Sequence, residues 1–423
     1  MHTSTSSSLR FGFILTGLAA LPFAASAQSP TVAAAKPAYT ITFIQPFGGS
    51  ESRSFGVNNS GQATGISYIE GDTAYHAFLS TLSATLPTHP DGGSYDMGTL
   101  GGDYARGFGV NTSGQVAGDS IITKDIGNHA PLYNHAFLTD PSSIVPGYVG
   151  QPGKKHDLGT LGGAQSGAYG VNDLGQVAGY SNTLAGPEHA FLSAPNGGAL
   201  HDLGTLGGAN SYGYGVDASG QVTGVSAIGS GADHAFLTGT NGSAMRDLGT
   251  LGGTTSSGSG VNVFGQVVGT SALAGGASRA FLSDANGGAL HDLGTLGGTA
   301  SFGSGVNDYG QAVGYSLTSG SQTHAFVFSN GAMTDLNSLL DKNYIFSFVL
   351  ENATSISNTG YIVGYARTNT DHVLGFVLTP SGGLQPPISP VPEASTTVSL
   401  GLLMLGLGGM AAAAKRRKGA AQA

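Results

Sequence analysis

Histidine and aspartate recur at regular positions along this chain, and both residue types are suited to metal binding and acid–base chemistry. One set of histidines opens a repeated His-Ala-Phe segment, and another precedes a repeated Asp-Leu-Gly: His76, His135, His189, His234 and His324, then His156, His201 and His291. The two segments are predicted to be antiparallel neighbours in one sheet, so the two sets begin at opposite ends and do not converge. Arg279 and Arg246 replace histidine in two copies. We therefore predict a polar strand-end role and no metal site.

The repeated aspartate is predicted to cap a turn or an edge amide. A glycosidase needs two carboxylates at a defined separation in one cleft, whereas repetition supplies many carboxylates without singling out a pair. The sequence has no Gly-x-Ser-x-Gly, His-Glu-x-x-His or phosphate-binding loop, and it has no cysteine. We expect no catalytic residue, cofactor or metal ligand; a weak carbonyl-lined calcium site stays open.

A tandem repeat must position these residues. Asp-Leu-Gly-Thr-Leu-Gly-Gly begins at Asp157, Asp202, Asp247 and Asp292, at intervals of 45 residues. A Gly-Gln pair, once Gly-Tyr, marks seven copies at Gly61, Gly114, Gly175, Gly220, Gly265, Gly310 and Gly360. Each copy holds four short strand-like runs joined by Asn/Asp-x-x-Gly and Asn-Gly turns, which are typical of β-hairpins. A period in the 40s with seven copies predicts an all-β, seven-bladed β-propeller of four-stranded antiparallel blades over residues 39–380.

Side-chain size predicts the strand order within a blade. Small residues alternate along the Gly-Val-Asn strand, for example Gly213 and Gly215, and glycine in a strand marks close backbone approach. We place this strand innermost, the Gly-Gln strand second, the His-Ala-Phe strand third and Asp-Leu-Gly-Thr-Leu outermost. Three strands at the end of the body lack a fourth, so residues 39–47 are predicted to complete the last blade and to hide its open edge.

The period lengthens in two copies. Residues are added between Ser80 and Tyr95, between Thr139 and His156, and in the link before His135. The first two links join equivalent strands in adjacent blades, so they are expected on one face of the disc. Tolerated surface variation and a binding surface both explain such insertions.

The N-terminus reads as a secretory signal over residues 1–27, followed by a linker at 28–38. Arg10 precedes an apolar run, and Ala25-Ser26-Ala27 provides a small-residue cleavage site before Gln28.

The C-terminus carries a second signal after a proline-rich linker at 381–390. Apart from Ser399, the 17 residues 398–414 are apolar or glycine, and they span about 26 Å as a helix, just enough for a bilayer core. The cations Lys415, Arg416, Arg417 and Lys418 follow, before a short tail at 419–423. They predict a single transmembrane helix whose basic end stays cytoplasmic while the body is exported.

Charge restricts the partners. Only 9% of residues are charged; without Arg10 and the four terminal cations, ten basic residues face 24 acidic ones. The resulting net charge of −14 disfavours nucleic acid and anionic surfaces. Cations, neutral glycans and proteins remain as possible partners.

The repeats resemble the HAF-repeat family of bacterial extracellular proteins over residues 39–380. The segment Val391, Pro392, Glu393 and Ala394, with the apolar run and basic cluster, resembles a PEP-CTERM sorting signal at 391–418; Ala394 replaces the second proline. This resemblance implies an exosortase-type processing enzyme and export machinery as partners in a Gram-negative producer of exopolysaccharide. It also implies a transient inner-membrane anchor before the protein reaches the cell surface.

Together these features favour a non-catalytic binding or structural component of an exopolysaccharide or biofilm matrix, with polysaccharide or surface proteins as partners. The alternatives are a propeller enzyme acting on polysaccharide, such as a hydrolase or lyase, and a purely protein-binding adhesin.

Overall fold

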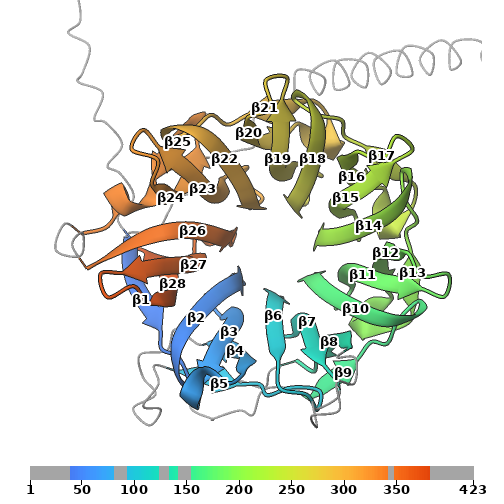
Figure 1. Cartoon of the computed structure of the whole chain (residues 1–423), viewed down its shortest axis with the longest axis horizontal. Helices are drawn as coiled ribbons and strands as arrows, with labels where there is room; N and C mark the ends of the chain where they lie inside the picture. The colour runs from blue at the N-terminus through green and yellow to red at the C-terminus, as the bar shows by residue number, and fades with distance from the viewer. Residues whose placement is uncertain (1–38, 81–92, 123–132, 142–153, 342–346, 382–423) are drawn as a thin grey trace, which may run out of the picture. The chain divides into compact units, whose positions relative to one another are not determined.

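The seven predicted blades are present and form a closed ring (Figure 1). A computed structural model describes residues 39–80, 93–122, 133–141, 154–341 and 347–381. Each blade is a four-stranded antiparallel sheet, and the sheets are arranged radially about a central axis. The prediction of a seven-bladed β-propeller is confirmed.

The strands follow the chain in the order expected for a meander. Blades 1 to 3 are β2 (Gly48–Val57), β3 (Ala63–Ile69), β4 (Tyr75–Ser80), β5 (Ser94–Asp96); β6 (Ala105–Val110), β7 (Val116–Ile121), β8 (Asn134–Thr139), β9 (Lys155–Asp157); and β10 (Gly162–Val171), β11 (Val177–Thr183), β12 (Glu188–Ser193), β13 (Leu200–Asp202). Blades 4 and 5 are β14 (Gly207–Val216), β15 (Val222–Ile228), β16 (Asp233–Thr238), β17 (Met245–Asp247); and β18 (Gly252–Val261), β19 (Val267–Leu273), β20 (Ser278–Ser283), β21 (Leu290–Asp292). Blades 6 and 7 are β22 (Gly297–Val306), β23 (Ala312–Thr318), β24 (Thr323–Ser329), β25 (Ala332–Asp335); and β26 (Phe348–Ile356), β27 (Ile362–Thr368), β28 (Val373–Pro380), β1 (Tyr39–Ile44).

Five short 3₁₀ segments lie between strands: η1 (Glu70–Asp72), η2 (Pro195–Gly197), η3 (Thr240–Gly242), η4 (Ala285–Gly287) and η5 (Leu336–Leu339). Three of them contain the predicted Asn-Gly turns. In η2 both Asn196 (φ 54°) and Gly197 (φ 65°) are left-handed, as a tight hairpin turn requires.

The Gly-Val-Asn strand is innermost, as predicted (Figure 1). Its glycines are needed because neighbouring blades approach there. A Cβ on Gly107 would lie 2.2 Å from Oγ1 of Thr64 in the preceding blade, and one on Gly56 would lie 2.4 Å from the Phe108 carbonyl oxygen in the following blade. Crowding at the axis therefore explains the small residues of this strand.

The outermost strand is shorter than predicted. In blade 3 it is Leu200–Asp202, so it ends at the aspartate instead of continuing through Leu206. The Asp202 carboxylate accepts a hydrogen bond from the amide of Gly204 at 2.8 Å, and this turn ends the ladder. The glycine pair that follows Leu206 begins the next inner strand at Gly207.

The ring closes as predicted, by pairing the first strand of the body with the last. β1 pairs antiparallel with β28, from Tyr39 opposite Pro380 to Ile44 opposite Gly375. β1 ends three residues earlier than the predicted segment 39–47, because the chain turns there into β2. Through this pairing the last blade has four strands, like each of the other blades.

The core is divided among the interfaces between blades. The phenylalanine of each His-Ala-Phe segment, or its equivalent, is fully buried: Phe78, Phe137, Phe191, Phe236, Phe281, Phe326 and Phe376. Between blades 1 and 2, for example, Ala77 and Leu79 pack against Val116 and Phe137. Each blade is therefore stabilised mainly by its neighbours.

Side-chain amide hydrogen bonds link neighbouring blades near the axis at five of the seven junctions. The side chain of Asn111 donates to the Asn172 carbonyl of the next blade at 3.0 Å, and Asn172 donates to the Asp217 carbonyl at 2.9 Å. The same link joins Asn58 to Asn111, Asn262 to Asn307, and Asn307 to Ser357.

Several predicted segments lie outside the described residues. These are the signal peptide and its cleavage site, the linkers at 28–38 and 382–390, the sorting signal at 391–418, the tail, and most of the three lengthened links. Among the described residues, no helix has the length and apolar character needed to span a membrane.

Candidate functional site

The histidines and aspartates singled out by their spacing form hydrogen-bonded pairs within blades. Nδ1 of His189 lies 2.9 Å from both carboxylate oxygens of Asp202. The same pair is His76–Asp96, His135–Asp157, His234–Asp247 and His324–Asp335 in other blades, and Arg279–Asp292 at 3.7 Å in blade 5. The second histidine set is separate, since His156 and His291 contact Asp140 and Asp284. The prediction that the two sets do not converge is confirmed.

These pairs stabilise the outer half of a blade. The aspartate also accepts the turn amide two residues later, as predicted for a capping role. The pairing with histidine was not predicted from the sequence, although both residues recur together and lie on adjacent strands. Within the described ranges, no group of three or more histidine or acidic side chains is arranged to hold a metal ion.

A different site lies on the inner strands. Each inner strand has a β-bulge two residues before its final valine or isoleucine; in β2, Ser54 pairs with Gly65 and Gly56 pairs with Thr64, which leaves Phe55 as the extra residue. The equivalent bulges fall at Phe108, Tyr169, Tyr214, Ser259, Ser304 and Thr354. Because a bulge re-aims its side chain, this residue is half-buried in every blade instead of fully buried in an interface core.

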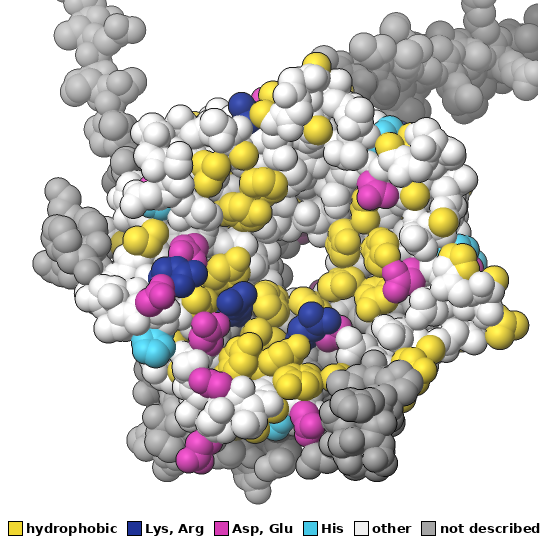
Figure 2. All heavy atoms as spheres, in the orientation of Figure 1, with side chains coloured by type: hydrophobic (Ala, Val, Ile, Leu, Met, Phe, Trp, Pro, Cys, Tyr) yellow, Lys and Arg dark blue, Asp and Glu magenta, His cyan; other side chains and the backbone are white. Residues whose placement is uncertain are grey.

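Four of these bulge residues form a continuous series, which we call the aromatic arc: Phe55, Phe108, Tyr169 and Tyr214, in blades 1 to 4. Their ring centroids are 5.3, 4.9 and 5.2 Å apart in that order. Blades 5 to 7 have only hydroxyl side chains at the same position. Figure 2 shows hydrophobic side chains gathered around the central opening. The arc therefore gives one side of the ring an aromatic lining.

Further aromatic residues extend this surface outward. Tyr180 lies 6.0 Å from Tyr169 and 5.5 Å from Tyr212 between ring centroids, and Tyr75 lies 4.8 Å from Tyr104. Burial raises the pKa of Tyr75, Tyr169 and Tyr180. These phenols are therefore uncharged at neutral pH and can donate or accept hydrogen bonds.

Arginine–carboxylate pairs accompany the aromatic rings. Arg106 lies over the ring of Phe108, 5.3 Å from its centroid, and Arg53 lies at the same distance from that of Tyr365. Arg106 pairs with Asp119, and Arg53 pairs with Glu51 at 3.3 Å. The charges of these two guanidinium groups are thus compensated by carboxylates.

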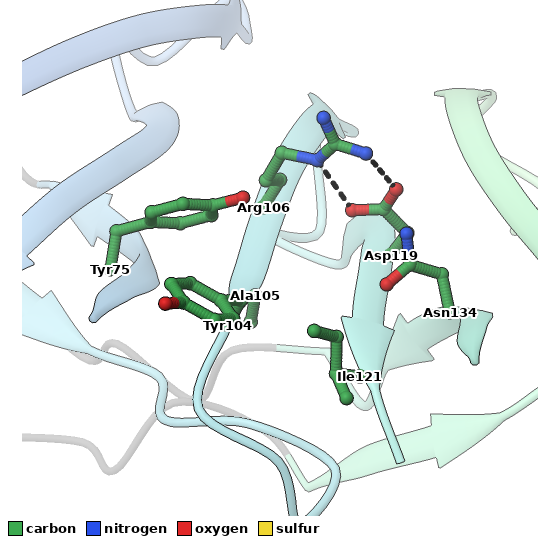
Figure 3. A pocket seen from close by; sticks show the side chains of 7 residues that line it. All are labelled: Tyr75, Tyr104, Ala105, Arg106, Asp119, Ile121 and Asn134. Carbon is green, nitrogen blue, oxygen red and sulfur yellow. Dashed lines mark hydrogen bonds and ion pairs between the residues drawn. The ribbon is translucent and has the colours of Figure 1, made fainter. Parts of the chain in front are cut away.

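A pocket of about 200 Å³ opens between blades 1 and 2, next to the arc (Figure 3). Nε of Arg106 donates to Asp119 at 2.8 Å, and Nη2 donates to its other oxygen. The hydrogen bond to Asp119 raises the pKa of Arg106 further, so the guanidinium group stays charged at every ordinary pH. The pocket lining is Tyr75, Tyr104, Ala105, Arg106, Asp119, Ile121 and Asn134.

Sequence reasoning missed this site because its members are far apart in the chain. A signal was present: the residue two before the Gly-Val-Asn valine is Phe, Phe, Tyr and Tyr in the first four copies and Ser, Ser and Thr in the rest. The change from aromatic to hydroxyl residues within a repeat that is otherwise regular could have identified it.

Comparison with known proteins places one segment in a named class. The PEP-CTERM protein-sorting motif matches residues 390–418, which confirms the predicted motif. The motif implies exosortase-dependent export and sorting to the cell envelope. No curated protein matches the sequence.

The solved structures that are similar to this chain include two at low identity. TolB from Acinetobacter baumannii is 11% identical with a TM-score of 0.41, over 79% of this chain and 65% of the TolB chain. A gluconolactonase from Xanthomonas campestris is 11% identical with a TM-score of 0.33, over 70% of this chain and 88% of that chain. At these scores neither similarity bears on function.

Proposed function

We propose that this protein is a HAF-repeat propeller that is exported, sorted through its PEP-CTERM signal, and then binds polysaccharide without catalysis in a cell-surface or exopolysaccharide matrix. The observation that carries this proposal is the aromatic arc of Phe55, Phe108, Tyr169 and Tyr214 beside the central opening. Its ligand-facing groups come from rigid strands, which suits a binding surface.

The chemistry of the arc favours a carbohydrate ligand. Sugars have apolar C–H faces that pack on aromatic rings, while their hydroxyls exchange hydrogen bonds with phenols and with arginine–carboxylate pairs. The arc and the tyrosines around it provide both kinds of contact over adjacent blades. The net negative charge of the body disfavours nucleic acid.

The partners and positions of the carboxylates favour binding of the polysaccharide over its cleavage. Asp119, whose partner Arg106 lies over Phe108 of the arc, and Glu51 are each paired with an arginine. The histidine–aspartate pairs recur from blade to blade on outer strands, so they do not form one catalytic centre. A glycoside hydrolase needs a general acid and a second carboxylate that flank the same glycosidic bond. The histidine–aspartate pairs do not supply that arrangement.

The test combines retention with turnover. The full-length chain, solubilised in detergent, is applied to immobilised neutral polysaccharides, and release of new reducing ends and unsaturated ends is followed in parallel. We expect retention without release of either kind of end. Release that is abolished by one aspartate substitution would favour a hydrolase or lyase instead. Absence of both retention and release would leave a protein-binding adhesin.

A further inference from the structure

The pocket between blades 1 and 2 has the features of a site for one small ring. Two tyrosine rings, Tyr75 and Tyr104, lie 4.8 Å apart between centroids at an interplanar angle of 51°, and Ile121 adds an aliphatic surface. Its volume of about 200 Å³ is below the 300–1,000 Å³ usual for drug-sized ligands. The pocket therefore suits a single ring more than a dinucleotide or a peptide.

The polar side of the pocket has no excess charge. The side chain of Asp119 is only 3% exposed and accepts two hydrogen bonds from Arg106, whose side chain is 36% exposed. An anion would have to compete with this buried carboxylate for the guanidinium group. A cation would be repelled by the positive charge of the guanidinium group itself. The pair thus disfavours both kinds of charged ligand while leaving hydrogen-bonding groups at the surface.

Groups suited to hydroxyls remain. Figure 3 shows the third guanidinium nitrogen of Arg106 turned away from Asp119 and the side chain of Asn134 on the other side of the carboxylate. The Tyr75 ring lies on the opposite side of the pocket from Asn134. Guanidinium and carboxamide groups bind hydroxyl oxygens, and the tyrosine rings pack on C–H groups.

We propose that this pocket binds one uncharged sugar unit of a polysaccharide, with the Arg106–Asp119 pair as the element that selects a neutral unit over a uronate. This inference rests on the proposed polysaccharide-binding function and adds the ligand class and its location. Because Arg106 also lies over Phe108, the bound sugar unit is adjacent to the aromatic arc, along which the chain continues.

The first experiment compares neutral gluco-, galacto- and manno-oligosaccharides with oligo-uronates by calorimetry on the full chain. We expect the wild-type protein to prefer a neutral set at least tenfold. Tyr75→Ala should weaken that binding at least tenfold, while Tyr315→Ala, a half-buried tyrosine in blade 6, should leave it unchanged. Equal loss in both variants, or a preference for oligo-uronates in the wild type, would overturn the inference.

The second experiment tests the ion pair. Asp119→Asn keeps the shape of the side chain but leaves Arg106 uncompensated, so binding of oligo-uronates should rise at least tenfold and become weaker with added salt. Unchanged ligand preference in a folded variant would show that the pair does not select charge. If Asp119→Asn fails to fold, the Tyr75 comparison still decides whether the pocket binds the sugar.

The two proposals fail in different ways. Binding of polysaccharide that is sensitive to Phe108→Ala but not to Tyr75→Ala would retain the proposed function and reject the pocket. Absence of binding to any member of either set would reject both.

Discussion

Blades 1 to 4 and blades 5 to 7 share one backbone design but present different surfaces at the axis. Phe191 of blade 3 and Phe281 of blade 5 are equally buried, and both inner strands have the same bulge. The bulge residue is Tyr169 in the former blade and Ser259 in the latter. This residue lies outside the regular ladder and outside the interface core. It can therefore change from aromatic to hydroxyl without altering the blade.

The asparagine links between blades are interrupted at the two boundaries between these parts. Asp217 and Ser357 replace asparagine in blades 4 and 7, and neither has a side-chain amide to donate to the following blade. From blade 7 to blade 1 the connection is made instead by Thr359, which donates to the Asn59 carbonyl at 2.8 Å. The aromatic part thus ends at the two junctions where the asparagine link is missing.

The strongest test of a shared scaffold is removal of the buried phenylalanine in each part. Phe191→Ala and Phe281→Ala should each reduce the free energy of unfolding by about 3–5 kcal/mol, because each leaves a cavity in an interface core. Denaturant unfolding measures this. A difference between the two variants of more than about 2 kcal/mol would contradict equivalence of the blades.

The aromatic part should carry the binding. Phe108→Ala combined with Tyr169→Ala should weaken polysaccharide binding by about tenfold or more, since each aromatic contact contributes about 0.5–1.5 kcal/mol beyond area burial. The matched control is Ser259→Ala combined with Ser304→Ala, which should bind like the wild type. Affinity electrophoresis in polysaccharide gels compares the two; equal retardation would refute the assignment.

The converse substitution extends the arc. Ser259→Tyr combined with Ser304→Tyr places rings at the bulges of blades 5 and 6, and long oligosaccharides should bind about threefold tighter per added contact. Short oligosaccharides that occupy only the first blades should bind as before. A gain that does not depend on oligosaccharide length would indicate a different binding path.

The junction between blades 4 and 5 should be strengthened by restoring the amide. Asp217→Asn allows donation to the Asn262 carbonyl, as Asn172 donates to Asp217, and should add about 0.5–1.5 kcal/mol to the free energy of unfolding. Asn172→Asp should lose a similar amount. Thermal unfolding compares both variants; destabilisation by Asp217→Asn would show that the carboxylate has its own role at this junction.

The smallest effect concerns pH and the histidine–aspartate pairs. Burial would raise the pKa of Asp96, but hydrogen bonds from His76 and the Gly98 amide and the charge of Lys155 outweigh it, so the pKa is lowered. The folded state therefore binds this proton less readily than the unfolded chain, whose aspartates titrate near pH 4. The stability is present above that pH and is lost as the pH falls through the folded value.

Asp96→Asn should accordingly flatten the acid limb of the stability curve, measured by urea unfolding between about pH 2 and 6. The control is Asp292→Asn in blade 5, where Arg279 replaces histidine. Asp96 is intact in this variant, so its contribution to the acid limb should remain. An unaltered acid limb in Asp96→Asn would contradict the argument.

Much of the architecture was predictable because short stretches of sequence determine its turns. The turn glycines such as Gly175 (φ 68°) and Gly220 (φ 75°), and the Asn-Gly turns, specify hairpins wherever they occur. Repetition at 45 residues then gives the number of blades. The outer strand was predicted too long because its end depends on the Asp202 carboxylate capping the Gly204 amide, a contact that strand propensity does not reveal.

The sequence by itself determined the repeat, the hairpins, the innermost strand and the segment that closes the ring, since these follow from short-range turn chemistry and side-chain size. The tertiary structure alone decided that residues 55, 108, 169 and 214 meet in one arc, and that Arg106 and Asp119 form a pocket wall with Tyr75 of the preceding blade. These residues belong to separate repeats or strands, and radial packing with the bulge in each inner strand brings them together.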